Sequence, residues 1–207
     1  MTVCVPCFGR PQRTKRVVEQ IVSQRFDGCS EAFVIGDCCP DFQNLMDEGF
    51  FADMQKRIAG TQNALIVSNM PMHGGGCGYV IRNKVKELAN GQYFIYVDND
   101  DCIEPNHFQN YVDSINGTDL DFAYHDVYVY CWKDKRNAIL QFGSVGHAEL
   151  IIRTDFLKQM PPHSPEYGHD WQLIQAMIDR GAKYMKFDKQ PTYKVMSLPN
   201  CKEKGID

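Results

Sequence analysis

The 207-residue sequence lacks any apolar run approaching the ~18 residues that a membrane-spanning helix needs. Its first residues also lack the order of a secretory signal, because the apolar stretch comes before the positive charges. These two absences lead us to expect a soluble, cytoplasmic protein with no membrane span.

An excess of positive charge is also lacking. Lys and Arg number 22 against 26 Asp and Glu, so the formal net charge is −4 at pH 7. A chain of this charge has no general attraction for a phosphate backbone, which argues against a general nucleic-acid binder. Hydrophobic residues make up 43% and charged residues 23%, which is ordinary for a folded protein, and the length suits a single domain.

Cysteine, by contrast, is plentiful, with nine residues. Without a secretory signal, we expect free thiols. Cys4 and Cys7 have the C-x-x-C spacing of redox motifs, but Cys4 lies inside an expected strand rather than before a helix. A zinc site needs a second ligand pair, and only the adjacent Cys38 and Cys39 are offered. The pattern therefore does not favour redox or zinc chemistry.

The first half of the chain alternates between strand and helix patterns. Short apolar segments at 2–6, 32–36, 64–68 and 92–97 indicate strands, and the segments between them have helical apolar spacing. This alternation predicts an α/β fold with a mainly parallel sheet flanked by helices. In such sheets, ligands bind beyond the carboxyl ends of the strands.

The second half is less regular. Alternating residues over 121–132 predict one long strand, and 138–142 is expected to pair with it. Apolar spacing predicts helices after Pro105 and from His169, and late strands at 184–187 and 192–196.

Polar residues follow three of the expected strands. The first strand ends in residues 6–10, the second in Asp37, and the fourth runs into Asp98-Asn-Asp-Asp. Carboxylates packed this closely repel one another, and hard oxygen ligands suit Mg²⁺ or Mn²⁺. A divalent cation held there would bridge a diphosphate. A solvated turn before a helix is the alternative.

Four blocks, in order along the chain, resemble family 2 glycosyltransferases of the GT-A fold: 3–11, 34–41, 82–101 and 169–173. The third is the most detailed, with Arg-Asn, a helix ending Ala-Asn-Gly-Gln-Tyr, an apolar strand and an Asp-x-Asp-Asp (DXD) motif. The resemblance covers most of residues 2–175. It implies a GT-A (Rossmann-like) single domain with a mixed, mainly parallel central sheet.

The resemblance implies roles for donor-binding residues. Pro6, Phe8 and Arg10 would line the nucleotide pocket. Asp37 matches the carboxylate that pairs with the base, and Arg82 would face the diphosphate.

It also implies the metal and catalytic residues. Asp98 would contact the ribose or sugar, and Asp100, with Asp98, would ligate Mn²⁺ or Mg²⁺. Asp170 matches the general base of inverting members, a role that suits a carboxylate facing the acceptor hydroxyl. His169 precedes it, placed either to orient Asp170 or to titrate near neutral pH and compete for its charge.

The implied function is a metal-dependent, hexosyltransferase-like enzyme. It would move a sugar from a nucleotide diphosphate sugar to an acceptor hydroxyl with inversion, and UDP-sugars are common donors in the family. The acceptor is unidentified and would be a carbohydrate, a lipid-linked or another hydroxyl compound. We expect residues 1–101 to form the nucleotide-sugar-binding half of the domain and residues 102–207 the acceptor-binding and catalytic half.

Three positions depart from the family pattern. Gly36 replaces the first Asp of an Asp-Asp pair, His169 replaces a Glu, and Met196 replaces a late His. A thioether cannot replace imidazole for a hard cation, so no late metal ligand is carried over. These departures leave open a nucleotide-sugar-binding or degenerate transferase-like module without catalysis.

Two other enzyme classes share some of these motifs. A nucleotidyltransferase shares metal carboxylates but would show a Gly-rich, basic loop after the first strand, where residues 6–10 have one glycine and a proline. An α/β-hydrolase is suggested by the Gly run at 74–76, but G-x-S-x-G is missing.

Overall fold

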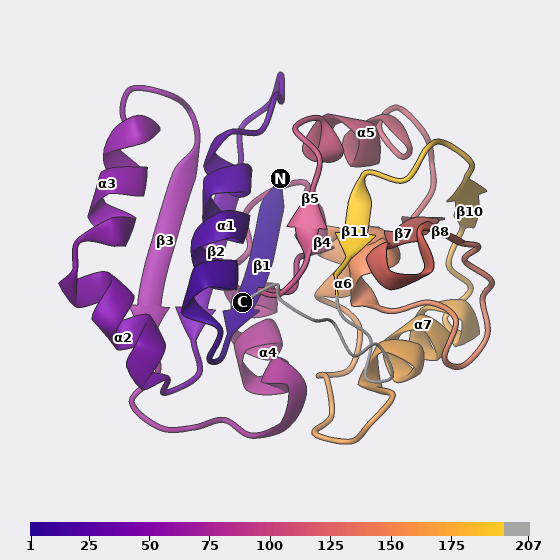
Figure 1. The fold of residues 1–207 in the computed structure, drawn as a ribbon. Helices are drawn as coiled ribbons and strands as arrows, with labels where there is room; N and C mark the ends of the chain where they lie inside the picture. The colour runs from indigo at the N-terminus through magenta and orange to yellow at the C-terminus, as the bar shows by residue number, and fades with distance from the viewer. Residues whose placement is uncertain (197–207) are drawn as a thin grey trace.

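The computed structural model describes residues 1–196, apart from the side chain of Cys77. Its main sheet has the strand order β10-β6-β9-β4-β1-β2-β3 (Figure 1). The strands are β1 (Thr2–Cys7), β2 (Glu31–Gly36), β3 (Ala64–Asn69), β4 (Tyr93–Tyr96), β6 (Phe122–His125), β9 (Leu150–Arg153) and β10 (Tyr184–Phe187). β1 to β4 run parallel, whereas β9 is antiparallel to both of its neighbours. The expected mixed, mainly parallel sheet is confirmed.

Helices cover both faces of this sheet (Figure 1). One face packs against α1 (Pro11–Val22), α2 (Pro40–Asp47), α3 (Phe50–Arg57) and α5 (His107–Asp113). The other packs against α4 (Tyr79–Leu88), α6 (Thr154–Leu157) and α7 (His169–Asp179). Short 3₁₀ turns occur at η1 (Gly76–Gly78), η2 (Tyr130–Trp132) and η3 (His147–Glu149).

The alternation of side chains along β1 accounts for the two covered faces. Val3 and Val5 belong to the core on the α1 side, and Cys4 belongs to the core on the α4 side. All three are fully buried, and complete burial of a valine stabilises the fold by about 1.5–3 kcal/mol. A strand buried on both faces reads as a continuous apolar run, which is why the sequence pattern located it.

A second, smaller sheet has the order β5-β11-β7-β8. Its strands are β5 (Cys102–Ile103), β11 (Tyr193–Val195), β7 (Val127–Val129) and β8 (Asp134–Arg136). β11 pairs antiparallel with β5, which directly follows the acidic segment at 98–101. The late strand β11 is thereby placed beside that segment.

The predicted long strand over 121–132 is wrong, because it divides at Asp126. β6 belongs to the main sheet, and β7 belongs to the small one. The buried carboxylate of Asp126 accepts the backbone N–H of Ala138 at 2.8 Å. The segment 138–142 therefore does not pair with the strand as expected, and β8 pairs with β7 instead.

The expectation of free thiols holds for part of the described chain. Cys4, Cys7, Cys29, Cys38, Cys39 and Cys102 are free, whereas Cys131 is bonded in a disulfide, so the expectation is wrong there. Burial raises the pKa of the Cys4 thiol to about 12 and also raises the pKa of Cys7. Both thiols stay protonated at neutral pH, so neither is poised for redox chemistry.

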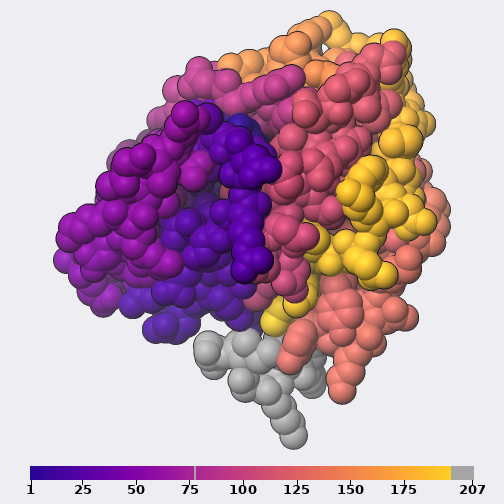
Figure 2. Space-filling view, turned by 90° about the horizontal axis from the view of Figure 1, so that it is seen from above, coloured from indigo at the N-terminus to yellow at the C-terminus, as the bar shows by residue number. Residues whose placement is uncertain are grey.

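Within residues 1–196, none of the helices combines the length and apolar character needed to cross a membrane. Figure 2, seen from above, shows the indigo and purple N-terminal segments on the left and the pink, orange and yellow later segments on the right. The two halves of the chain thus lie on opposite sides of the molecule. Their division at residue 101 into donor and acceptor halves stays a prediction.

Candidate functional site

A cavity of about 710 Å³ opens at the carboxyl ends of β1, β2 and β4. Its wall combines residues far apart in the sequence, including Pro6, Phe8, Arg10, Asp37, Arg82, Asp98 and Asp100. All of the side chains expected to bind the donor therefore line one cavity, hereafter the donor cavity. The parallel register of β1, β2 and β4 explains this, because it brings their ends to the same edge of the sheet.

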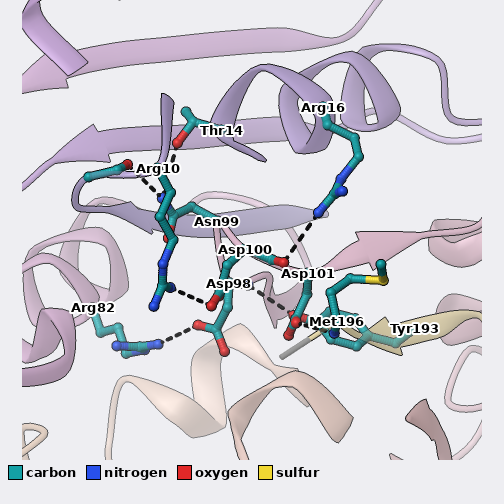
Figure 3. Close-up of polar contacts among 11 residues, drawn as sticks. Arg10, Thr14, Arg16, Arg82, Asp98, Asn99, Asp100, Asp101, Tyr193 and Met196 are labelled. Atoms are coloured by element: carbon teal, nitrogen blue, oxygen red, sulfur yellow. Dashed lines mark hydrogen bonds and ion pairs between the residues drawn. The ribbon is translucent and has the colours of Figure 1, made fainter. Parts of the chain in front are cut away.

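The turn from β1 to α1 directs Arg10 into the donor cavity. Gly9 and Arg10 both have left-handed backbone conformations, with φ of 59° and 53°, and Pro11 begins α1. This conformation is unfavourable for a non-glycine residue, and such strain is concentrated at functional sites. The Arg10 guanidinium forms an ion pair with Asp100, as Figure 3 shows.

Arg82 approaches the same carboxylates from α4. Its Nη2 donates to Asp98 Oδ1 at 2.8 Å, and the residue is only 5% exposed. Gly78, just before α4, makes this approach possible. A Cβ atom at Gly78 would lie 2.7 Å from the Pro6 Cβ and 3.1 Å from Arg82 Nη1. A side chain at position 78 would therefore push against both walls of the cavity.

The acidic segment is held by hydrogen bonds that the sequence did not reveal. Asp101 accepts the Tyr193 hydroxyl and the Met196 backbone N–H, each at 2.9 Å (Figure 3). The same hydroxyl accepts the N–H of Asp98 at 3.0 Å. Burial, and then the nearby Asp98, raises the pKa of Asp101 well above its usual range. Asp101 is thus a structural group that ties the segment to β11.

Asn99 anchors the same segment on its other side. Its amide donates to Thr14 Oγ1 at 3.0 Å and contacts the Gly9 carbonyl oxygen at 3.5 Å. With Asn99 and Asp101 turned into the protein, Asp98 and Asp100 are the carboxylates of this segment that line the donor cavity.

Asp37 lies at the far end of the donor cavity, where β2 ends. Its carboxylate accepts the Gly74 backbone N–H at 2.6 Å, and its Oδ2 lies 2.9 Å from His73 Nδ1. The His73 ring also lies 5.1 Å, centroid to centroid, from the exposed ring of Phe8. His73 was missed from the sequence, because a histidine beside a glycine run carries no strand-end signal.

A second cavity of about 350 Å³ adjoins the first. It shares Arg82, Asp98 and Asp100 with the donor cavity, and apart from Asp101 its other lining residues come from the second half of the chain. His169 and Asp170 lie in its wall, at the start of α7. We call it the acceptor-side cavity, because Asp170 is expected to face the acceptor. It meets the donor cavity at one guanidinium and two carboxylates.

Asp170 lies in the first turn of α7. Gly168 precedes the helix with φ of 85°, and Asp170 Oδ1 accepts the Trp171 backbone N–H at 2.8 Å. A helix N-terminus stabilises negative charge. His169 Nδ1 lies 3.1 Å from the Ser164 carbonyl oxygen, so this nitrogen carries the proton and donates. Burial and the nearby Arg82 charge lower the pKa of His169, which keeps the ring neutral at pH 7.

Two more buried histidines lie behind His169. His163 Nε2 is 3.0 Å from the Tyr96 hydroxyl, and His163 Nδ1 is 3.3 Å from His147 Nε2. Burial, with the charges of Arg82 and Lys86, lowers the pKa of His163 to about 3. Sequence reasoning missed this group because its members come from separate, irregular segments.

The fit of a divalent cation depends on Asp98 and Asp100. Within residues 1–196, His, Cys, Asp and Glu side chains form no group of three suited to a metal ion. Mg²⁺ commonly uses only one or two protein carboxylates and completes its shell with substrate phosphates and water. Asp98 and Asp100 fit that shared type of site, with Arg10 and Arg82 as their present partners.

Comparison with known proteins agrees with this architecture. The sequence model of glycosyl transferase family 2 matches residues 80–180. No curated protein sequence matches the chain. The recognition of a family 2-like glycosyltransferase of the GT-A fold is therefore supported by the motifs, by the segment that the family model matches and by the fold.

Among solved structures, Staphylococcus aureus TarS 1-349 in complex with UDP is similar, with 17% identity and a TM-score of 0.72 over 96% of this chain and 60% of TarS 1-349. TarS 1-349 in complex with UDP-GlcNAc gives 18% identity and a TM-score of 0.72 over 96% and 59%. The mannosyltransferase PcManGT from Pyrobaculum calidifontis, in complex with GDP-Man and Mn²⁺, gives 15% identity and a TM-score of 0.72, over 96% of this chain and 57% of that structure. At these identities the likeness shows the GT-A fold, and the chain spans less than two thirds of each of these structures.

Proposed function

We propose that this protein transfers a sugar from a nucleotide diphosphate sugar to an acceptor hydroxyl. One observation carries the proposal: two cavities meet at Arg82, Asp98 and Asp100, and Asp170 lies in the wall of the second. Such a meeting point suits a reaction in which the acceptor hydroxyl approaches the anomeric carbon of the donor from the side opposite the diphosphate.

The donor fits the first cavity in chemistry as well as in position. The exposed Phe8 ring offers a face for a base, and Asp37 offers an acceptor for its N–H groups. Arg10 and Arg82 supply positive charge for the diphosphate. TarS binds UDP and UDP-GlcNAc, which favours a UDP-sugar here.

A divalent cation is part of the proposal, with Asp98 and Asp100 as its protein ligands. PcManGT, which shares the fold, is in complex with GDP-Man and Mn²⁺. Such a cation, when bound with the diphosphate, would offset the negative charge on the leaving nucleotide.

In the proposed reaction, Asp170 removes the proton from the acceptor hydroxyl. The acceptor oxygen then bonds to the anomeric carbon while the bond from that carbon to the diphosphate oxygen breaks. The electron pair leaves with the nucleotide, where Arg82 meets the new charge. A single displacement inverts the anomeric configuration. Because His169 is neutral, it leaves the charge of Asp170 available for this step.

A non-catalytic, nucleotide-sugar-binding module is the second candidate. The ion pair between Arg10 and Asp100 favours it, because it occupies the carboxylate expected to hold the cation. Met196 occupies the position where the family has a late histidine. Its backbone N–H donates a hydrogen bond to Asp101.

A thermal-shift panel with UDP, GDP, UDP-Glc, UDP-GlcNAc and GDP-Man, each with and without Mn²⁺, tests the proposal. A ligand at 100 times its Kd should stabilise the protein by ~2.7 kcal/mol. We expect one nucleotide series to bind more tightly with Mn²⁺, and its sugar form to release nucleoside diphosphate. Binding without any release, in the presence of acceptors, would favour the binding module, and the absence of nucleotide binding would contradict both.

A further inference from the structure

The acceptor-side cavity carries two exposed aromatic rings at its edge. Phe142 is 60% exposed and Tyr167 is 89% exposed, and both line this cavity. Their ring centroids lie 6.5 Å apart with the planes at 74°. Large apolar side chains left in solvent beside a cavity are typical of binding surfaces.

The Phe142 ring lies against the backbone of Gly168. A Cβ atom at Gly168 would lie 2.7 Å from Phe142 Cε2, so a side chain at position 168 would displace the ring, and the φ of +85° disfavours such a side chain as well. Gly168 immediately precedes α7, which begins with His169 and Asp170. A ligand that stacks on Phe142 would therefore lie next to the proposed general base.

The charge of the cavity restricts what that ligand can be. Six carboxyl groups line it, from Asp98, Asp100, Asp101, Glu149, Glu166 and Asp170, against the guanidinium groups of Arg82 and Arg136. Arg136 is paired with Glu149, and Arg82 with Asp98. His147 and His169 add no positive charge, because burial keeps both neutral. Asp100 is paired with Arg10, and burial raises the pKa of Asp101, so the repulsion that an anionic acceptor would meet comes from Glu166 and Asp170.

We propose that the acceptor is a neutral saccharide whose ring stacks on Phe142 and Tyr167, with its hydroxyl groups directed to Glu166 and Asp170. A sugar ring has an apolar C–H face and a hydroxyl edge, which matches aromatic rings bordered by carboxylate acceptors. Phosphorylated, sulfated and carboxylated acceptors are disfavoured by the carboxylates of Glu166 and Asp170. This inference rests on the proposed function and adds the chemical class of the acceptor to it.

The test is a glycan array that contains neutral, phosphorylated, sulfated and carboxylated saccharides, screened with the whole protein in the presence of UDP and Mn²⁺. We expect binding to neutral saccharides. Phe142→Ala and Tyr167→Ala should each weaken it at least ~10-fold, whereas Tyr167→Phe should retain it. Trp132→Ala is the matched control, since Trp132 is 53% exposed and lines neither cavity.

Calorimetry of UDP with the same variants separates the two levels of the proposal. Three outcomes, each with normal UDP binding, would overturn the acceptor assignment. They are preferred binding of anionic saccharides, no saccharide binding, and saccharide binding that is unaffected by Phe142→Ala and Tyr167→Ala. If the wild-type protein bound neither UDP nor GDP, the proposed function itself would be overturned and the acceptor assignment with it.

Discussion

The guanidinium group of Arg10 pairs with the carboxylate of Asp100 at the edge shared by the two cavities. These residues lie 90 positions apart and come together because β1 and β4 end side by side. The pairing means that Asp100 already has a positive partner before any donor or cation arrives. A donor and a cation bound as proposed would therefore have to replace this ion pair with contacts of their own.

Asp100→Asn should remove the Mn²⁺ dependence of UDP binding while the fold is retained. Asn keeps the size of the side chain but offers a cation no negative charge. We expect UDP affinity in Mn²⁺ to fall at least ~10-fold and affinity without Mn²⁺ to change little, as measured by calorimetry. Asp119→Asn, at an exposed ion pair with Lys183, is the control. An Asp100→Asn protein with wild-type Mn²⁺ dependence would refute the metal assignment.

Asp37→Ala should weaken UDP and the intact UDP-sugar by the same factor, because both carry the base. A hydrogen bond to a charged group contributes about 1.5–3 kcal/mol, which corresponds to a loss of roughly 10- to 100-fold. Titration calorimetry of both ligands gives the two factors. If only the sugar-bearing ligand loses affinity, Asp37 does not contact the base.

Asp170→Asn should keep thermal stability and UDP affinity near wild type. Asn can accept the Trp171 N–H as Asp170 does, but it cannot take a proton. Turnover should fall by ~10²–10⁴-fold, the usual contribution of a general base. NMR of the product should show inverted anomeric configuration. Near-normal turnover of the folded variant would leave Asp170 as a helix-stabilising residue, and a retained configuration would rule out the single displacement.

Gly78→Ala should weaken UDP binding beyond its effect on stability. The added methyl group would press on Pro6 and Arg82, whereas at Gly117, which has a similar positive φ, it would meet open space. Both substitutions should cost about 1 kcal/mol of stability through backbone strain. UDP calorimetry and urea unfolding of the pair distinguish strain from displacement of Arg82. Equal UDP affinity in the two variants would contradict the packing argument.

Acidification should destabilise the protein through its buried histidines. Burial lowers the pKa of His107 and of His125 from 6.5 to about 3 each. Because the unfolded chain takes up these protons first, stability is full above pH 6.5 and falls as the pH drops toward 3. Each histidine contributes a slope of about 1.4 kcal/mol per pH unit in that range.

His107→Leu tests this slope, since His107 is fully buried and its Nε2 has no hydrogen-bond partner among the described residues. Urea unfolding between pH 7.5 and 4.5 should show a pH dependence reduced by one proton. The exposed His73 provides a control as His73→Asn. An unchanged slope in His107→Leu would show that this ring does not titrate on unfolding.

The sequence predicted the strands and helices in which apolar residues recur at regular spacing. β1 to β4 are apolar runs between helical patterns, and their carboxyl ends gather the polar residues, so both fold and donor cavity could be predicted. The break at Asp126 could not, because it depends on a hydrogen bond to Ala138, twelve positions away. A local alternation pattern carries no information about such a partner.

The candidate site was predictable where motifs are contiguous and unpredictable where partners are distant. Asp98 and Asp100 were identified from four adjacent residues, but Arg10 as the partner of Asp100 was not. The lowered pKa of His169 depends on burial and on the charge of Arg82, which only the folded chain brings about. Phe142 and Tyr167 gave no signal, since isolated aromatic residues in loops have no periodicity.

The hydrogen bonds that Tyr193 and Met196 donate to Asp101 span 92 and 95 positions. Closing a loop of this length costs conformational entropy, and these hydrogen bonds require both chain segments to be present. A nascent chain that has emerged only through β4 can pair its first four strands, yet its acidic segment still lacks these donors. The hydrogen bonds that hold the proposed cation-binding turn can therefore form only after nearly the whole chain has been synthesised.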